Sequence, residues 1–221
     1  QKLDRSKPEF GMTSTWGSQI TIFWALTAMF VGASARAGEW RELFNGRDLD
    51  GWTQLGSAKW TVKEGEIHGG QDGDPKRSGV LATKEQFKDF ELELEFKIDE
   101  HGKYNSGVYL RNEPGKAGRS GYQINIGRPA AEEFIGIYTD RWLAKGDETD
   151  LVRKKLDWNK LSILARGGHL KVSLNGVEII DYTEVSPTPA LLQAGVIAFQ
   201  TYGAENHAGW IRFRKLRVRE L

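Results

Sequence analysis

Hydrophobic and polar residues alternate one by one along several segments of the chain. In FELELEFKI, residues 90–98, the apolar side chains fall on every second position and glutamate or lysine fills the positions between them. This period of two residues predicts an antiparallel strand with one face in the core and one face in water. The segment HLKVSLNG, residues 169–176, repeats the alternation, and Asn175-Gly176 favours a type I′ hairpin into the next strand.

The last segment, WIRFRKLRVREL, changes phase along its length. Ile211 and Phe213 keep one phase, whereas Leu216 and Val218 keep the other, which predicts a β-bulge near Arg214-Lys215. Further strands are expected in residues 59–62, 65–68, 79–83, 134–138, 161–165 and 195–200. Residues 140–156 are expected to form the longest irregular loop.

About a dozen short strands with Gly, Asn and Asp turns, and no long helical pattern, indicate an all-β fold. We predict a two-sheet antiparallel jelly-roll sandwich of the concanavalin A-like type. No repeat or linker divides residues 38–221, so they are expected to form a single domain.

Residues 1–37 differ in kind from the rest of the chain. Residues 20–31 are uncharged and apolar, and Ala35-Arg36-Ala37 fits a small-residue cleavage site, so this stretch is expected to be a secretory signal peptide. An uncleaved anchor is the alternative, although a membrane helix needs about twenty apolar residues. Residues 1–11 are a basic leading region or an extension of another origin. We therefore expect an exported domain, periplasmic or secreted, without a stable membrane span after cleavage.

Charge and cysteine content exclude several classes of function. Residues 1–37 hold four of the 31 basic and two of the 30 acidic residues, which leaves 27 against 28 in the expected mature domain. A nearly neutral domain offers no general attraction to nucleic acid, so no nucleic acid partner is expected. The chain has no cysteine, which excludes disulfides, thiolate metal sites and a cysteine nucleophile.

Four expected strands carry small and amide-bearing side chains on the face that points away from the core. With a period of two, NSGVYLR (residues 105–111) and GYQINIG (121–127) place apolar side chains inward, as do FIGIY (134–138) and GVIAFQ (195–200). The outward polar positions are Asn105, Tyr109, Arg111, Gln123, Asn125, Tyr138 and Gln200, with glycines between them. Amides, phenols and guanidinium suit a neutral polyhydroxyl ligand, so we expect a sugar or glycoside to bind here. The alternative is a solvated sheet face without a ligand.

Signs of catalytic or metal chemistry are sparse outside that face. Trp142 could stack on a sugar ring or pack on the sheet, and His207 lies in an expected loop that could overhang the face. Asp72-Gly73-Asp74 could hold calcium, although a plain turn is the simpler interpretation. No histidine spacing of a known metal motif and no GxSxG, Walker or dinucleotide motif occurs. No cofactor is identified, and a divalent metal stays possible.

A series of motifs within residues 40–221 resembles, in its order along the chain, the 3-keto-disaccharide hydrolase domain family. The motifs are FNGRDLDGW, NSGVYLR, GYQINIG, WNKLSI, LNGVEI, IAFQTYG and IRFRKLRVREL. The resemblance implies a concanavalin A-like jelly roll of exported bacterial proteins that cleaves glycosides oxidised to a ketone at C3. A base removes the acidified C2 proton, the glycosidic oxygen leaves C1, and water then adds. In this scheme Arg111 stabilises the enolate, His207 is the expected base, and Gln123 and Asn125 orient the sugar.

The chain departs from the family pattern at two positions. Asn125 stands where an acidic residue is common, and Tyr202 stands where a histidine is common. Either change could remove a base or a metal ligand. The alternative function is therefore a non-catalytic carbohydrate-binding domain, of lectin or laminin-G type, that uses the same concave face. A plain adhesion sandwich is a third alternative, and it leaves the glycine-rich face unexplained.

Overall fold

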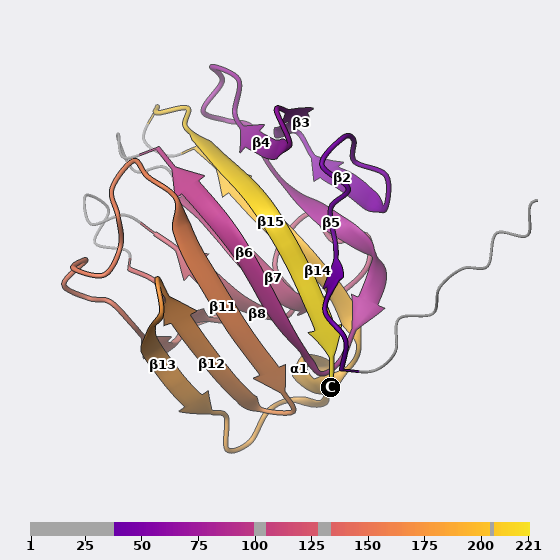
Figure 1. The fold of residues 1–221 in the computed structure, drawn as a ribbon, viewed down its shortest axis with the longest axis vertical. Coiled ribbons are helices and arrows are strands. Elements are labelled where there is room, and N and C mark those ends of the chain that lie inside the picture. The colour runs from indigo at the N-terminus through magenta and orange to yellow at the C-terminus, as the bar shows by residue number, and fades with distance from the viewer. Residues whose placement is uncertain (1–37, 100–104, 128–133, 204–205) are drawn as a thin grey trace, which may run out of the picture. The chain divides into compact units, whose positions relative to one another are not determined.

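The structure is a computed structural model that describes residues 38–99, 105–127, 134–203 and 206–221. These residues form strands in two antiparallel sheets and one helix of a single turn (Figure 1). The predicted all-β sandwich is confirmed. The predicted signal peptide lies outside the described residues, and no described segment forms a helix with the length and hydropathy that crossing a bilayer requires.

The first sheet has the order β13-β12-β11-β6-β15-β4-β3, and β1 pairs with β15. Its strands are β1 (Arg41–Glu42), β3 (Lys59–Lys63), β4 (Glu66–Gly70), β6 (Phe90–Ile98), β11 (Asn159–Arg166), β12 (His169–Leu174), β13 (Val177–Thr183) and β15 (Trp210–Glu220). β6 alternates buried and partly exposed residues along its whole length, as its sequence predicts.

The second sheet has the order β10-β9-β8-β7-β14-β5-β2. Its strands are β2 (Trp52–Gly56), β5 (Ser78–Phe87), β7 (Asn105–Asn112), β8 (Tyr122–Ile126), β9 (Gly136–Tyr138), β10 (Trp142–Lys145) and β14 (Gly195–Tyr202), and helix α1 (Pro189–Leu192) precedes β14. The four segments with unusual outward faces are therefore neighbours, in the order β9-β8-β7-β14.

The core lies between the two sheets and is made of the inward residues of both. Phe199 of the second sheet stacks on Phe213 of the first, with ring centroids 4.2 Å apart, and Trp52 stacks beside Phe199 at 5.3 Å. Phe199 and Phe213 are fully buried. Each such side chain contributes about 2 to 3 kcal/mol through burial, and the stack fixes the second sheet against the first.

Two local predictions are confirmed in detail. Asn175 and Gly176 both have positive φ, 51° and 86°, as a type I′ turn between β12 and β13 requires. The register of β15 against β6 shifts between Arg214 and Arg217, and Lys215 has a φ of 51°. This bulge returns Leu216 and Val218 to the core side of the strand.

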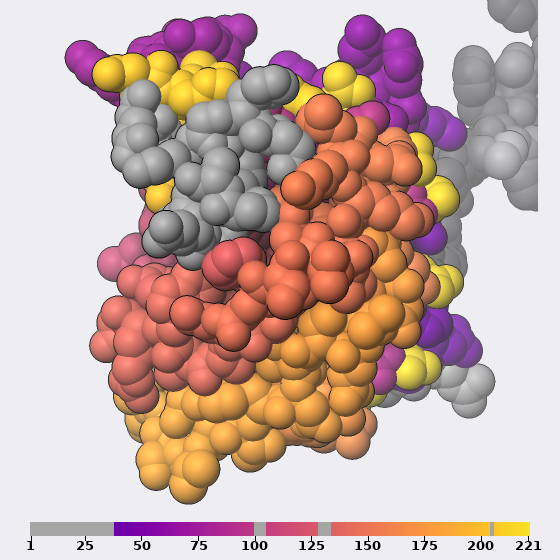
Figure 2. Space-filling model, turned by 90° about the vertical axis from the view of Figure 1, so that its left-hand side faces the viewer, coloured from indigo at the N-terminus to yellow at the C-terminus, as the bar shows by residue number. Residues whose placement is uncertain are grey.

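The loop expected at residues 140–156 is in part a strand. Trp142–Lys145 forms β10, which pairs with β9 at the edge of the second sheet. This strand has only four residues, which is too short for an alternation of apolar and polar positions to be recognised in the sequence. Figure 2 shows the side of the sandwich on which β9 and β10, in salmon, meet the amber segment that follows β13.

Candidate functional site

The outward faces of β7, β8, β9 and β14 enclose a hollow of about 400 Å³ on the second sheet. Nine described residues line it: Asn105, Tyr109, Arg119, Gln123, Asn125, Tyr138, Trp142, Gln200 and Tyr202. The structure thus brings together all seven residues for which we expected substrate contacts. Their role in binding stays a prediction. Arg119 and Tyr202 complete the lining.

The floor of the hollow is a network of amides. Gln123 Nε2 donates to Asn125 Oδ1 at 3.2 Å and to Gln200 Oε1 at 3.0 Å, and Asn125 Nδ2 donates to the Phe134 carbonyl at 3.1 Å. Gln123 and Asn125 are 6% and 3% exposed. Because each amide is held by another, the floor presents donors and acceptors in fixed orientation, which lowers the entropic cost of ordering them around a ligand.

Glycines in these strands make room for neighbouring side chains. A Cβ added at Gly107 would lie 2.6 Å from Gln123 Nε2, and one added at Gly136 would lie 2.8 Å from the Trp142 ring. Gln123 and Trp142 occupy the space beside these glycines, so the glycines make room for two lining residues.

The rim of the hollow is aromatic and cationic. The rings of Tyr138 and Trp142 meet edge to face at 5.2 Å, and the Arg119 guanidinium lies 5.2 Å from the centroid of the Tyr138 ring. Trp142 is 38% exposed, so part of its ring is open to a ligand. Arg119 is partly exposed and is the one charged residue among the nine described lining residues.

Two buried polar residues, Asn105 and Tyr109, face this hollow. Asn105 is 6% exposed, and its Oδ1 has no hydrogen-bond partner within the described part of the chain. Burial raises the pKa of Tyr109, the positive charge of Arg119 opposes this, and Tyr202 adds to it. The Tyr109 phenol is therefore neutral at ordinary pH. A hydroxyl-rich ligand would supply the hydrogen bonds that an unpaired buried acceptor lacks.

Arg111, our expected enolate stabiliser, points elsewhere. It has a φ of 55°, and its guanidinium donates to the carbonyls of Lys88, Gly167 and Leu191 and to the Asp89 carboxylate. The side chain is fully buried. The expectation that Arg111 shares the outward face with Tyr109 is wrong, because a bulge in β7 interrupts the alternation between them.

His207 does not line the hollow either. Its Nε2 lies 3.0 Å from the buried Asp99 Oδ2, and its backbone carbonyl adjoins Gly203, the residue after Tyr202. The backbone of His207 thus lies near the end of β14, the strand that ends at Tyr202. The sequence pattern did not indicate Asp99 as a partner of His207; this residue directly follows β6.

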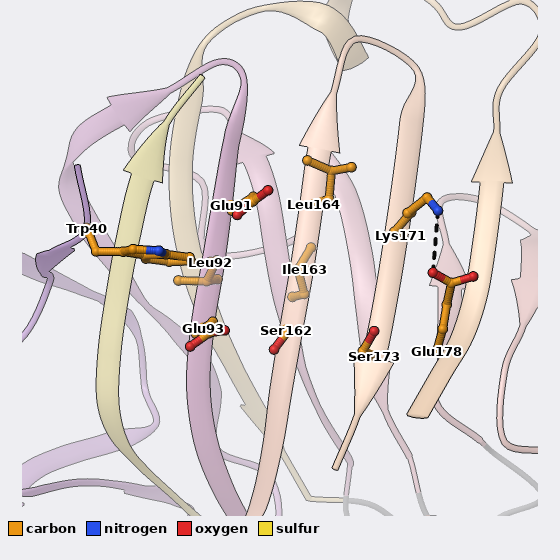
Figure 3. Close-up of a pocket in the computed structure, with 10 residues that line it drawn as sticks. All are labelled: Trp40, Glu91, Leu92, Glu93, Ser162, Ile163, Leu164, Lys171, Ser173 and Glu178. Atoms are coloured by element: carbon orange, nitrogen blue, oxygen red, sulfur yellow. Dashed lines mark hydrogen bonds and ion pairs between the residues drawn. The ribbon is translucent and has the colours of Figure 1, made fainter. Parts of the chain in front are cut away.

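A smaller cavity of about 250 Å³ lies on the outer face of the first sheet (Figure 3). Trp40 forms one wall, between Glu91 and Glu93. Lys171 and Glu178 form the other wall, and Lys171 Nζ lies 3.4 Å from Glu178 Oε2. The glutamates of β6 bond to arginines of β15, as Glu93 does with Arg217. Because its charged groups pair with one another, this cavity offers a ligand fewer free partners than the hollow on the second sheet.

No metal-binding arrangement occurs within the described ranges, where no three His, Cys, Asp or Glu side chains are grouped to hold an ion. Asp72 and Asp74 both pair with Arg77, at 3.2 and 3.8 Å. The Asp72-Gly73-Asp74 segment is therefore a turn closed by an arginine.

A family model described as the 3-keto-alpha-glucoside-1,2-lyase-like domain matches residues 39–219, nearly the whole described chain. The chain belongs to this family. A 3-keto-disaccharide hydrolase of Bacteroides thetaiotaomicron is 29% identical over 231 residues, which cover 81% of this chain and 77% of that protein. The resemblance seen in the sequence is thereby confirmed.

Solved structures support the same fold. A candidate glycosyl hydrolase from Parabacteroides distasonis superimposes with a TM-score of 0.60 and 20% identity over 82% of this chain and 94% of its own. A Bacillus subtilis protein of unknown function with a galectin-like fold superimposes with a TM-score of 0.62 and 14% identity, over 84% of this chain and 96% of its own. The carbohydrate-binding module CBM66 of Bacillus subtilis superimposes with a TM-score of 0.56 and 16% identity, over 76% of this chain and 94% of its own. The chain is thus a lectin-like jelly roll of a carbohydrate-active family.

Proposed function

We propose that this protein cleaves 3-keto-glycosides in the hollow on the second sheet. The observation that carries the proposal is the lining itself, a rigid floor of amides with an aromatic rim and a single cation. Amides and phenols satisfy sugar hydroxyls, and the face of an exposed indole packs against the C–H groups of a sugar ring. Family membership supports the choice of a sugar carrying a ketone at C3.

The proposed reaction is an elimination followed by a hydration. A ketone at C3 acidifies the proton on C2, and a base removes that proton to give an enolate. The bond between C1 and the glycosidic oxygen then breaks, the leaving alcohol takes up a proton, and a double bond forms between C1 and C2. Water adds across this double bond, so the sum of the two steps is hydrolysis.

Arg119 takes the role that we first expected of Arg111. Its guanidinium carries the positive charge of the hollow and is held over the Tyr138 ring, so it can bind the enolate oxygen as negative charge develops there. The neutral Tyr109 phenol can donate a hydrogen bond to the same oxygen or orient a neighbouring hydroxyl.

The base is a separate part of the proposal. None of the nine described lining residues carries a carboxylate or an imidazole. His207 stays our prediction for this role, and its contact with Asp99 supports it because a carboxylate on one ring nitrogen fixes the orientation of the ring. His207→Asn should then remove turnover and leave sugar binding intact.

The same lack of a carboxylate or imidazole among the nine described lining residues favours a second candidate function, sugar binding without cleavage. A site of neutral amides and aromatic rings is what a lectin needs, and the unpaired Asn105 Oδ1 would be satisfied equally well by a bound, unreacted sugar. This function uses the same hollow and differs only in the absence of a base that reaches C2.

One assay separates the two functions. The protein is incubated with a 3-keto-disaccharide and with its unoxidised parent, each with and without a chelator, and released monosaccharide is measured. Release from the oxidised sugar alone supports the hydrolase, whereas binding of either sugar without release supports the lectin-like function. Arg119→Ala should lower kcat/KM on the order of a hundredfold. Lys116→Ala, in the same loop but outside the hollow, serves as the matched control.

We also propose that the protein is exported after removal of residues 1–37. The apolar run at residues 20–31 and the Ala35-Arg36-Ala37 site support this. Sequencing of the mature N-terminus from an exporting bacterial host tests it, with a start at Gly38 expected. An intact N-terminus retained inside the cell would contradict it.

A further inference from the structure

A second cavity of about 260 Å³ adjoins the proposed sugar site and shares one wall with it. Arg119 lines both spaces, and Tyr138 of the first is followed directly by Thr139 and Asp140 of the second. The Tyr138 hydroxyl lies 3.4 Å from the Asp140 carbonyl, which ties the rim of the first cavity to the wall of the second. The two cavities are thus consecutive along the β9–β10 turn.

The lining of the second cavity has the mixed character that sugar rings require. Asp140 supplies a carboxylate, Ser186 and Thr188 supply hydroxyls, and Pro187 and Leu191 supply apolar surface. The hydrogen bond from Thr139 lowers the pKa of Asp140, and the positive charges of Arg141 and Arg119 lower it further, so this side chain is an ionised acceptor at neutral pH. A carboxylate can accept hydrogen bonds from two adjacent sugar hydroxyls.

We propose that this cavity is the subsite for the second sugar ring of a disaccharide. The proposal rests on the proposed function of the neighbouring hollow, which holds the first ring. Arg119 would stand at the junction, beside the glycosidic oxygen that links the rings. Figure 2 shows the side of the molecule on which the two walls of this subsite meet, the salmon β9–β10 region and the amber segment after β13.

Two variants one residue apart test the subsite. Ser186 lines the cavity and is exposed, so Ser186→Trp should fill the space without unfolding the domain. Val185 is 91% exposed and does not line the cavity, so Val185→Trp is the matched control. The probes are trehalose oxidised at C3 and methyl α-glucoside oxidised at C3, which carries only one ring. Turnover is measured by kcat/KM, and binding by titration calorimetry.

The wild type should prefer the disaccharide by about tenfold, the effect of one or two hydrogen bonds. Ser186→Trp should abolish this preference while its kcat/KM for the methyl glycoside stays unchanged, and Val185→Trp should behave as the wild type. Equal preference in the two variants, or none in the wild type, overturns the subsite and leaves the proposed function standing.

If neither oxidised sugar is turned over, the proposed cleavage fails and the subsite is judged by calorimetry alone, with unoxidised trehalose and methyl α-glucoside. A preference for trehalose that only Ser186→Trp removes still supports the subsite. Absence of binding by all four sugars overturns both proposals.

Discussion

Replacing Arg111 by alanine should destabilise the fold while leaving the sugar site in place. The guanidinium is buried and donates to the Gly167 carbonyl at 2.7 Å, to the Leu191 carbonyl at 3.0 Å, to the Asp89 carboxylate at 3.0 Å, and to the Lys88 carbonyl. These acceptors belong to the β5–β6 turn, the β11–β12 turn and α1. Alanine would remove the Arg111 donor from the three carbonyls, would leave the Asp89 carboxylate with the Gly167 N–H at 2.8 Å, and would open a void at the end of the sandwich.

The expected loss of stability follows from these contacts. Removing one partner of a buried, hydrogen-bonded ion pair costs about 3 to 5 kcal/mol. The Asp89 side chain is 31% exposed, so water can solvate part of its charge, and we take about 3 kcal/mol as the expected loss. For a domain of this size that corresponds to a fall in Tm of about 6 to 12 °C. Arg111→Lys should lose an intermediate amount, because one ammonium group cannot reach acceptors on three segments.

Thermal unfolding followed by circular dichroism, together with calorimetric titration of the sugar, measures both effects on each variant. Arg119→Ala is the matched comparison. Arg119 is partly exposed, so its loss should shift Tm by less than about 2 °C while weakening sugar binding. An Arg111→Ala protein with an unchanged Tm and a lost affinity would refute the assignment of the two arginines and return Arg111 to the ligand.

Two further predictions concern the rim of the hollow and the acid limit of the fold. Gly136→Ala should weaken sugar binding by about tenfold, because its Cβ would lie 2.7 Å from the Ala144 carbonyl and 2.8 Å from the Trp142 ring and would shift the β10 segment that carries the ring. Gly118→Ala, with open space around it, should leave calorimetric affinity unchanged. Glu93 and Glu95 have pKa values below the usual 4.5, because hydrogen bonds from basic residues outweigh the burial that raises them. The stability that these two carboxylates contribute is complete above about pH 5 and is lost as pH falls through the folded-state pKa. Replacing both by Gln should therefore make Tm fall less steeply between about pH 5 and 3. An unaltered slope of Tm against pH would contradict this.

The parts of the fold that the sequence predicts are those that local chemistry determines. β6 alternates strictly because one face of its sheet is solvated, and the β12–β13 hairpin needs two positive φ angles that Asn175 and Gly176 adopt readily. The bulge in β15 is visible because apolar residues on both sides of it must reach the same core. β1 and β10 escape prediction because two and four residues are too few to show a period.

The lining residues of the hollow were predictable where they lie on strands in which inward and outward side chains alternate. Outward positions of four strands identify six of the nine lining residues, because those strands are neighbours and regular there, and Trp142 was expected from the loop that follows them. Arg119 was not predictable in this way, since it lies in the loop before β8 and reaches the hollow only through its contact with the Tyr138 ring. A basic residue three positions before an amide-bearing strand, as in RSGYQIN, is the one sign that could have pointed to it.

The bulge in β7 explains why one short segment serves two purposes. Val196 pairs with Asn112 and Ala198 pairs with Tyr109, so β7 carries one residue more than β14 over this stretch. Before the bulge, Tyr109 faces the hollow; after it, Arg111 is turned by its positive φ toward the end of the sandwich. An outward polar side chain therefore indicates a ligand only where the strand is regular. Beyond a bulge the same residue type can instead hold segments of the fold together. The hydrogen-bond acceptors around its polar group decide whether it contacts a ligand or stabilises the fold.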